Sequence, residues 1–171
     1  MPKRLFIAIN LPMELKRELF EIQKEINAPF PEELTEAGLF KWVAMENLHL
    51  TLKFIGEVGG NQIPKIIENI ESIVKNQKPF EIKTKRICYD NEKQLPRLIW
   101  LTTNNGHITL ARIKQWVFKT IEPEERPNIS CDFEVKFPVN SIELMQSILK
   151  RTGPEYKIIK SFSLNNPPAS G

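Results

Sequence analysis

The only two histidines of the 171-residue chain lie in matching segments. The first segment reads His-Leu-Thr-Leu-Lys-Phe-Ile from His49, and the second reads His-Ile-Thr-Leu-Ala-Arg-Ile from His107. Four of the seven positions are identical, and a fifth exchanges leucine for isoleucine. An imidazole can give or accept a proton near neutral pH, and a threonine hydroxyl can bind a phosphate oxygen. The repeat therefore indicates a site with two proton-transfer groups and two hydroxyls.

Each segment is expected to form a β-strand, in which alternate side chains share one face. His49 and Thr51 then project together, and so do His107 and Thr109. The apolar residues of the other face are expected to enter the core: Leu50, Leu52 and Phe54 in the first strand, Ile108 and Leu110 in the second. Two such strands related by a rough two-fold axis would place the imidazoles across one groove. There, one imidazole can accept a proton and the other can donate one during in-line displacement at phosphorus, without a metal.

The composition excludes several other chemistries. Cys88 and Cys131 form no pair with the spacing of a zinc site or a disulfide framework, so we expect no metal. The sequence contains no glycine-rich phosphate loop, so we expect no nucleotide cofactor. The apolar run from Leu5 to Ile9 is too short for a signal peptide or a membrane span. We therefore expect a cytoplasmic protein with no membrane partner and no obligate protein partner.

Positive charge is concentrated around the second motif. Residues 83–119 hold eight basic and two acidic side chains, whereas residues 1–36 hold five basic and seven acidic ones. This basic stretch is either a solvated face or an anion-binding surface for phosphate or an RNA backbone.

The spacing of apolar residues predicts an α+β fold with a largely antiparallel sheet. Helical spacing covers residues 11–26 and 63–74, and the Pro- and Glu-rich segment 28–36 is expected to be a loop. Strands are expected at 5–9, 40–43, 48–55, 80–89, 97–103, 107–113, 133–137, 141–148 and 156–164. Residues 165–171 are expected to form a disordered tail.

At its two His-x-Thr motifs the sequence resembles the two-histidine phosphoesterases. More narrowly, it is similar to the RNA 2′,3′-cyclic phosphodiesterases, also known as 2′–5′ RNA ligases. The similarity extends to further segments: 4–9, 41–43, 46–48, 54–57, 97–100, 111–112 and 153–156. The resemblance implies a single bilobal domain over residues 1–164. Its two pseudo-symmetric, mostly antiparallel sheets would carry helices on the outside, with the active-site groove between the lobes.

The resemblance also implies a reaction, the hydrolysis of RNA ends with a 2′,3′-cyclic phosphate, such as those of tRNA halves, to a 2′-phosphate. His49 would donate a proton to the leaving 3′ oxygen, and His107 would be the base that activates water. Thr51 and Thr109 would hold the phosphate. With a 5′-hydroxyl RNA end in place of water, the reverse reaction is 2′–5′ ligation. The alternatives are a related phosphodiesterase that acts on cyclic nucleotides or trims RNA 3′ ends, and a non-catalytic module that binds RNA or nucleotides.

Some residues near the motifs are harder to place. The family has a phosphate-binding arginine at the position of Arg112, but strict alternation puts Arg112 on the face opposite His107. It reaches the site only if the strand twists, bulges or ends early. Lys53 has the parity of His49 but lies at the far end of its strand, where a solvated lysine is the simpler interpretation. Base stacking is open to Phe6, Trp42, Trp100 and Trp116, with core packing favoured for Trp100.

The connection that precedes the second motif is short. Only the five residues Thr102 to Gly106 separate Leu101 from His107, whereas the family places a helix there. The pair Asn105-Gly106 favours a tight hairpin, which would make the two flanking strands direct neighbours. Either this chain has lost the helix or the sequence omits a segment.

Overall fold

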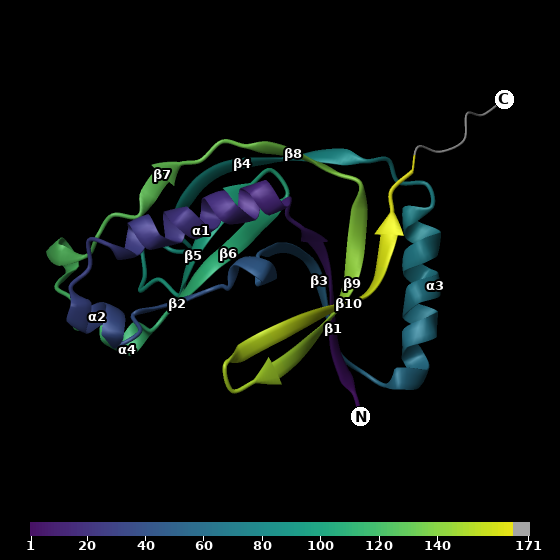
Figure 1. Cartoon of the computed structure of the whole chain (residues 1–171), viewed down its shortest axis with the longest axis horizontal. Helices are drawn as coiled ribbons and strands as arrows, with labels where there is room; N and C mark the ends of the chain where they lie inside the picture. Colours follow the sequence, from purple (N-terminus) through teal and green to yellow (C-terminus); the bar gives the residue numbers. More distant parts are fainter. Residues whose placement is uncertain (166–171) are drawn as a thin grey trace. The chain divides into compact units, whose positions relative to one another are not determined.

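A computed structural model describes residues 1–165, and these divide into two compact units that hold one histidine motif each (Figure 1). Unit 1 is formed by residues 1–10, 49–82 and 136–165, and unit 2 by residues 11–48 and 83–135. Most of the expected disordered tail, residues 166–171, lies outside the described residues.

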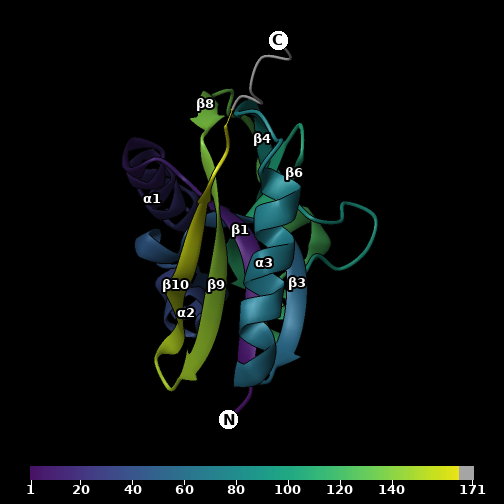
Figure 2. The same cartoon turned by 90° about the vertical axis from the view of Figure 1, so that its right-hand side faces the viewer.

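Unit 1 is an antiparallel sheet with the strand order β10–β9–β1–β3. Its strands are β1 (Lys3–Asn10), β3 (His49–Val58), β9 (Ser141–Lys150) and β10 (Gly153–Ser163), with the short β8 (Lys136–Val139) before β9. β1 is central and covered on both faces, because Leu5 and Ala8 are both fully buried. Helix α3 (Ile63–Val74) runs along this sheet and buries Ile70 and Val74 (Figure 2). Its isoleucine spacing gives the helix the single apolar side that this packing requires.

In unit 2 the sheet strands are antiparallel in the order β6–β5–β4–β7, and β2 also pairs with β6. Its strands are β2 (Phe40–Trp42), β4 (Phe80–Tyr89, which begins in unit 1), β5 (Leu98–Thr103), β6 (Gly106–Ile113) and β7 (Ser130–Asp132). Helix α1 (Met13–Asn27) covers one face of the sheet and buries Leu15 and Leu19 (Figure 1). The shorter helices are α2 (Glu32–Glu36), α4 (Gln115–Phe118), η1 (Met45–Asn47) and η3 (Pro123–Glu125) in unit 2, and η2 (Gly60–Gln62) in unit 1.

The two predicted helices and most predicted strands are confirmed, but two segments differ. Segment 28–36 contains the short helix α2, because Pro31 stands directly before its first turn, where Glu32 and Glu33 favour the positive helix end. The strand expected at 133–137 is interrupted between β7 and β8. There the backbone of residues 133–135 bonds the buried Thr84: the Thr84 hydroxyl donates to the Phe133 carbonyl at 2.6 Å and accepts from the Val135 N–H at 2.8 Å.

The short connection forms the predicted hairpin, and β5 and β6 are direct antiparallel neighbours. The turn lies at Asn104 and Asn105, one residue earlier than expected, because Gly106 already pairs with Thr103. The Thr103 hydroxyl accepts from the Asn105 N–H and donates to the Gly106 carbonyl, each at 3.0 Å. Gly106 has a φ of +127°, which a residue without a Cβ adopts at little cost.

Candidate active site

The first motif lies on β3 and contains a β-bulge at its last position. Ala8 of β1 is opposite Thr51 and the preceding Ile7 is opposite Lys53, so Leu52 is an extra residue without a partner. A bulge of this kind reverses the alternation of the residues that follow it. The pattern of strict alternation expected from the sequence therefore holds only up to Thr51.

The bulge corrects three predictions about β3. Leu50 is buried as expected, but Leu52 and Phe54 are 43% and 68% exposed rather than part of the core. Phe54 is opposite Phe6 and therefore shares the face of Thr51, whereas Lys53 is shifted to the other face. The predicted parity of Lys53 with His49 is thus wrong.

Aromatic side chains surround the imidazole of His49. Its ring centroid lies 5.2 Å from that of Phe6 and 5.1 Å from that of Tyr156, which meets it edge to face. His49 Nε2 and Thr51 Oγ1 share a hydrogen bond of 2.9 Å. Phe6 is buried and Tyr156 packs against it, so the ring contacts of His49 rest on the core of unit 1. These contacts hold the imidazole and the hydroxyl of the motif in one orientation.

The second motif repeats the bulge at the same position. On β6, Thr109 is opposite Trp100 and Ala111 is opposite Ile99, so Leu110 is the extra residue. Leu110 follows Thr109 just as Leu52 follows Thr51 in the first motif. The two His-x-Thr-Leu segments therefore share a backbone irregularity as well as a sequence.

This second bulge moves Arg112 to the face of the motif. Arg112 is opposite Leu98 on β5, and Leu98 shares its side of β5 with Trp100, the partner of Thr109. Strict alternation, which puts Arg112 on the opposite face, does not hold here, and the bulge is one of the conditions under which Arg112 was expected to reach the motif's face. Arg112 and Thr109 lie on one face of unit 2, and the Arg112 side chain is exposed.

Hydrogen bonds from α1 and the β2 edge stabilise the bulge at Leu110. The carbonyl of Leu110 accepts from the Val43 N–H at 2.8 Å and from Gln23 Nε2 at 3.3 Å. Gln23 Nε2 also donates to the Val43 carbonyl at 3.1 Å, and its side chain is almost fully buried. A buried amide satisfied in this way fixes the bulge, because the alternative is unpaired polar groups in the core.

The imidazole of His107 lies against the indole of Trp100, and His107 is exposed overall. The ring centroids of His107 and Trp100 are 4.1 Å apart, so Trp100 contacts a histidine of the motif, a role that the core packing favoured for it did not include. Partial burial lowers the pKa of His107, while the carboxylate of Asp90 acts in the opposite direction. Asp90 Oδ1 is held at the start of β5 by the backbone N–H groups of Arg97 and Leu98, at 2.9 and 3.1 Å. This environment favours a neutral imidazole that can accept a proton.

Sequence reasoning identified both motifs but missed the side chains that position them. Tyr156 falls within segment 153–156, which resembles the family, but the sequence assigns no role at the site to Tyr156, Asp90 or Gln23. Each lies well away from its partner in the chain, and only the tertiary fold brings them together. For Trp100 the sequence contains a weak indication, because an aromatic residue on a strand next to a histidine strand can pack against the histidine ring.

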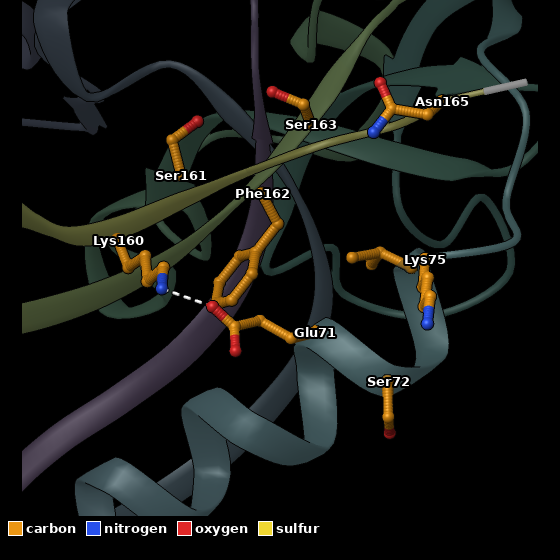
Figure 3. Close-up of a pocket in the computed structure, with 9 residues that line it drawn as sticks. Glu71, Ser72, Lys75, Lys160, Ser161, Phe162, Ser163 and Asn165 are labelled. Atoms are coloured by element: carbon orange, nitrogen blue, oxygen red, sulfur yellow. Dashed lines mark hydrogen bonds and ion pairs between the residues drawn. The ribbon is translucent and has the colours of Figure 1, made fainter.

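We also searched the described residues for a metal site, a membrane-spanning helix and a cavity. Within residues 1–165, no group of three or more His, Cys, Asp or Glu side chains gathers as a metal site requires. No helix in the same part of the chain has the length and apolarity to cross a membrane. A hollow of about 410 Å³ lies in unit 1 beside the ion pair of Lys160 and Glu71, between α3 and β10 (Figure 3). None of the predicted site residues lines this hollow.

Comparisons with known proteins agree with the sequence resemblance. The family model described as LigT like Phosphoesterase matches residues 9–100. An RNA 2′,3′-cyclic phosphodiesterase of Thermotoga maritima is 30% identical over 185 residues, which cover 91% of this chain and 92% of that protein. Another, of Aquifex aeolicus, is 28% identical over 154 residues, covering 72% of this chain and 81% of that protein. The first alignment is longer than this chain, so the Thermotoga protein contains residues that this chain lacks.

Solved structures show the same fold. A crystal structure of a Thermus thermophilus protein matches with a TM-score of 0.78 and 25% identity, over 95% of this chain and 98% of that one. A structure of Escherichia coli LigT complexed with 3′-AMP matches with a TM-score of 0.73 and 23% identity, over 97% of this chain and all of that one. The predicted fold class is confirmed by these matches.

Proposed function

The chain belongs to the LigT-like phosphoesterase family, and from that premise we propose that it hydrolyses 2′,3′-cyclic phosphate ends of RNA to 2′-phosphates. The substrate class comes from the relatives in Thermotoga maritima and Aquifex aeolicus, which carry this activity in their names. The single observation that supports it most is the repeated bulged strand, because each copy presents an imidazole and a hydroxyl on one face.

In the proposed mechanism, His107 is the base and His49 the acid. Neutral His107 removes a proton from water as the water oxygen attacks phosphorus. The bond from phosphorus to the 3′ oxygen breaks, and protonated His49 gives its proton to that oxygen. The product carries a 2′-phosphate and a free 3′-hydroxyl, and one water molecule is consumed. The lowered pKa of His107 supports its assignment as the base, because an imidazole that stays neutral can accept a proton.

The remaining groups of the motifs would stabilise the phosphate. Thr51 and Thr109 each provide a hydroxyl beside an imidazole, and Arg112 provides a guanidinium that can bind two phosphate oxygens. As negative charge builds on the non-bridging oxygens, these donors stabilise the transition state more than the ground state. The same groups would serve the reverse reaction, 2′–5′ ligation, when a 5′-hydroxyl RNA end replaces water.

The decisive experiment is product analysis with a defined RNA. A short oligoribonucleotide that ends in a 2′,3′-cyclic phosphate is incubated with the protein in the presence of a chelator, and the position of the product phosphate is identified. We expect a 2′-phosphate as the only product, formed at least about 100-fold more slowly by the His107→Ala variant. A 3′-phosphate would contradict the proposed leaving group, and loss of nucleotides from the 3′ end would favour a trimming exonuclease. Binding without turnover would favour a non-catalytic module.

A further inference from the structure

A second cation lies directly beside Arg112 on the exposed face of unit 2. Lys41 of β2 is the strand partner of Arg112 on β6. Directly opposite residues of an antiparallel pair have Cβ atoms about 5 Å apart and project from the same face. Lys41 therefore extends the face that carries Arg112 and Thr109 by one strand.

The neighbours of Lys41 confirm which face it occupies. Phe40 and Trp42 are opposite Ile113 and Ala111, and both of these β6 residues are buried. Lys41 itself is exposed, as is Arg112. Along β2, the exposed Lys41 therefore lies on one face of the sheet, and the apolar Phe40 and Trp42 lie on the other.

Two positive charges in this position repel each other. Like charges directly opposite on a sheet are destabilising, and a carboxylate nearby would relieve the repulsion. Within residues 1–165, neither Lys41 nor Arg112 forms an ion pair. An anion on this face would bind both cations and remove their repulsion.

The chemistry of the substrate limits what this anion can be. The following step rests on the proposed function, in which Arg112 binds the cyclic phosphate. An RNA that ends in a 2′,3′-cyclic phosphate continues in one direction only, through the phosphodiester on the 5′ side of its last nucleotide. The next negative charge along the substrate is therefore that phosphodiester.

We propose that Lys41 forms a subsite for the phosphodiester on the 5′ side of the terminal nucleotide, so that the enzyme favours RNA chains over cyclic mononucleotides. Lys41 binds a group that a cyclic mononucleotide lacks. Its contribution therefore appears in the preference between the two substrates, rather than in the chemistry at the cyclic phosphate.

The test compares kcat/KM for two substrates with the same terminal base, a hexaribonucleotide with a 2′,3′-cyclic end and the 2′,3′-cyclic mononucleotide. We expect Lys41→Gln to lower the ratio of the two values about tenfold, the size of one hydrogen bond to a charged group. Lys41→Arg should restore the ratio. The dependence of hexanucleotide affinity on salt should also weaken by about 0.7 in its logarithmic slope, the value for one phosphate contact with a single strand.

The matched control is Lys119→Gln, an exposed lysine after α4 in the same unit. It should leave the substrate ratio at the wild-type value. An unchanged ratio in Lys41→Gln would overturn the subsite, and so would an equal loss with both substrates. If wild-type protein hydrolyses neither substrate, the proposed function fails. The subsite is then decided by the affinity of a fluorescent hexaribonucleotide with a 3′-phosphate: weaker binding by Lys41→Gln supports it, and equal binding overturns it.

Discussion

The two histidine motifs share the same backbone geometry, but different side chains surround their imidazoles. Both strands bulge at the leucine of His-x-Thr-Leu, so the residue five positions after each histidine returns to the motif's face. That residue is Phe54 in unit 1 and Arg112 in unit 2. His49 lies among aromatic rings, whereas His107 lies on the face of two cations and within the field of Asp90. The same strand geometry can therefore give two imidazoles different chemical properties, because the side chains around each imidazole differ.

The two bulges also differ in how they are stabilised. Leu52 is 43% exposed, whereas Leu110 is fully buried and its carbonyl is bound by Gln23 and Val43. The bulge in unit 2 is therefore fixed by helix α1, and with it the orientation of Arg112. We infer that the unit 2 motif depends on packing at a distance more than the unit 1 motif does.

The largest difference in activity between the two motifs should appear when Phe54 and Arg112, the residues five positions after each histidine, are replaced. Arg112→Ala should lower kcat/KM for cyclic-ended RNA by about 10²–10³-fold, the cost of one transition-state donor. Phe54→Ala should lower it by less than about tenfold, because an exposed apolar ring has no charge to offer the phosphate. Steady-state kinetics measure both, and equal losses would show that the two positions are not functionally distinct.

The anchoring of the second bulge is tested by Gln23→Leu. Loss of the two amide hydrogen bonds should reduce the free energy of unfolding by about 2 kcal/mol. It should also lower kcat/KM about tenfold through Arg112, about the worth of a hydrogen bond to a charged group, so that the loss disappears when Arg112→Ala is already present. Leu19→Ala, in the same helix, is the control that destabilises the fold without touching the bulge. A Gln23→Leu loss that persists in the Arg112→Ala background would refute this coupling.

The contact between Trp100 and His107 should be visible in the pH profile. Burial lowers the pKa of His107, so the neutral base persists to lower pH than an exposed imidazole would. Trp100→Leu exposes the ring, and the acidic limb of kcat/KM should move to higher pH. Trp116→Leu, at an exposed tryptophan on α4, should leave the limb in place. A limb that stays fixed in Trp100→Leu would mean that His107 is not the group titrating there.

The smallest expected effect is that of Asp90→Asn, which should shift the acidic limb of kcat/KM in the direction opposite to that of Trp100→Leu. Asparagine keeps the acceptor for the Arg97 and Leu98 N–H groups but removes the charge that raises the pKa of His107. The acidic limb should therefore move to lower pH. Because the chain has only two histidines, NMR titration of the imidazole protons resolves His107 directly. A rise in its pKa would contradict the assigned role of Asp90.

The same lowered pKa links His107 to stability. A folded-state pKa below that of the unfolded chain means that the unfolded state binds the proton more tightly. The contribution of His107 to stability is therefore present above the unfolded pKa and is lost as the pH falls through the folded pKa.

Periodicity predicted the helices α1 and α3 and both motif strands, and the turn residues before His107 predicted the hairpin, because all of these depend on local sequence. Periodicity gave the wrong face for Leu52, Phe54 and Arg112, because each strand contains a bulge. Neither bulge leaves a mark in the types of residue that form it. A strand pattern of period two cannot reveal which residue loses its partner. The partner strand decides that, and in β6 the bulge at Leu110 is also bonded by Gln23 of helix α1, far away in the sequence.

The proposed mechanism requires His49 and His107 to act on the same phosphate, and a double-mutant cycle tests this requirement. The rates of wild type, His49→Ala, His107→Ala and the double variant are measured on an oligoribonucleotide with a 2′,3′-cyclic end. Each single variant should lose about 10²–10⁴-fold in kcat. The double variant should be at most a few-fold slower than the slower single variant, because acid and base serve one transition state. A single variant with the wild-type rate, or two losses that multiply in full, would show that the two imidazoles do not act together on one phosphate.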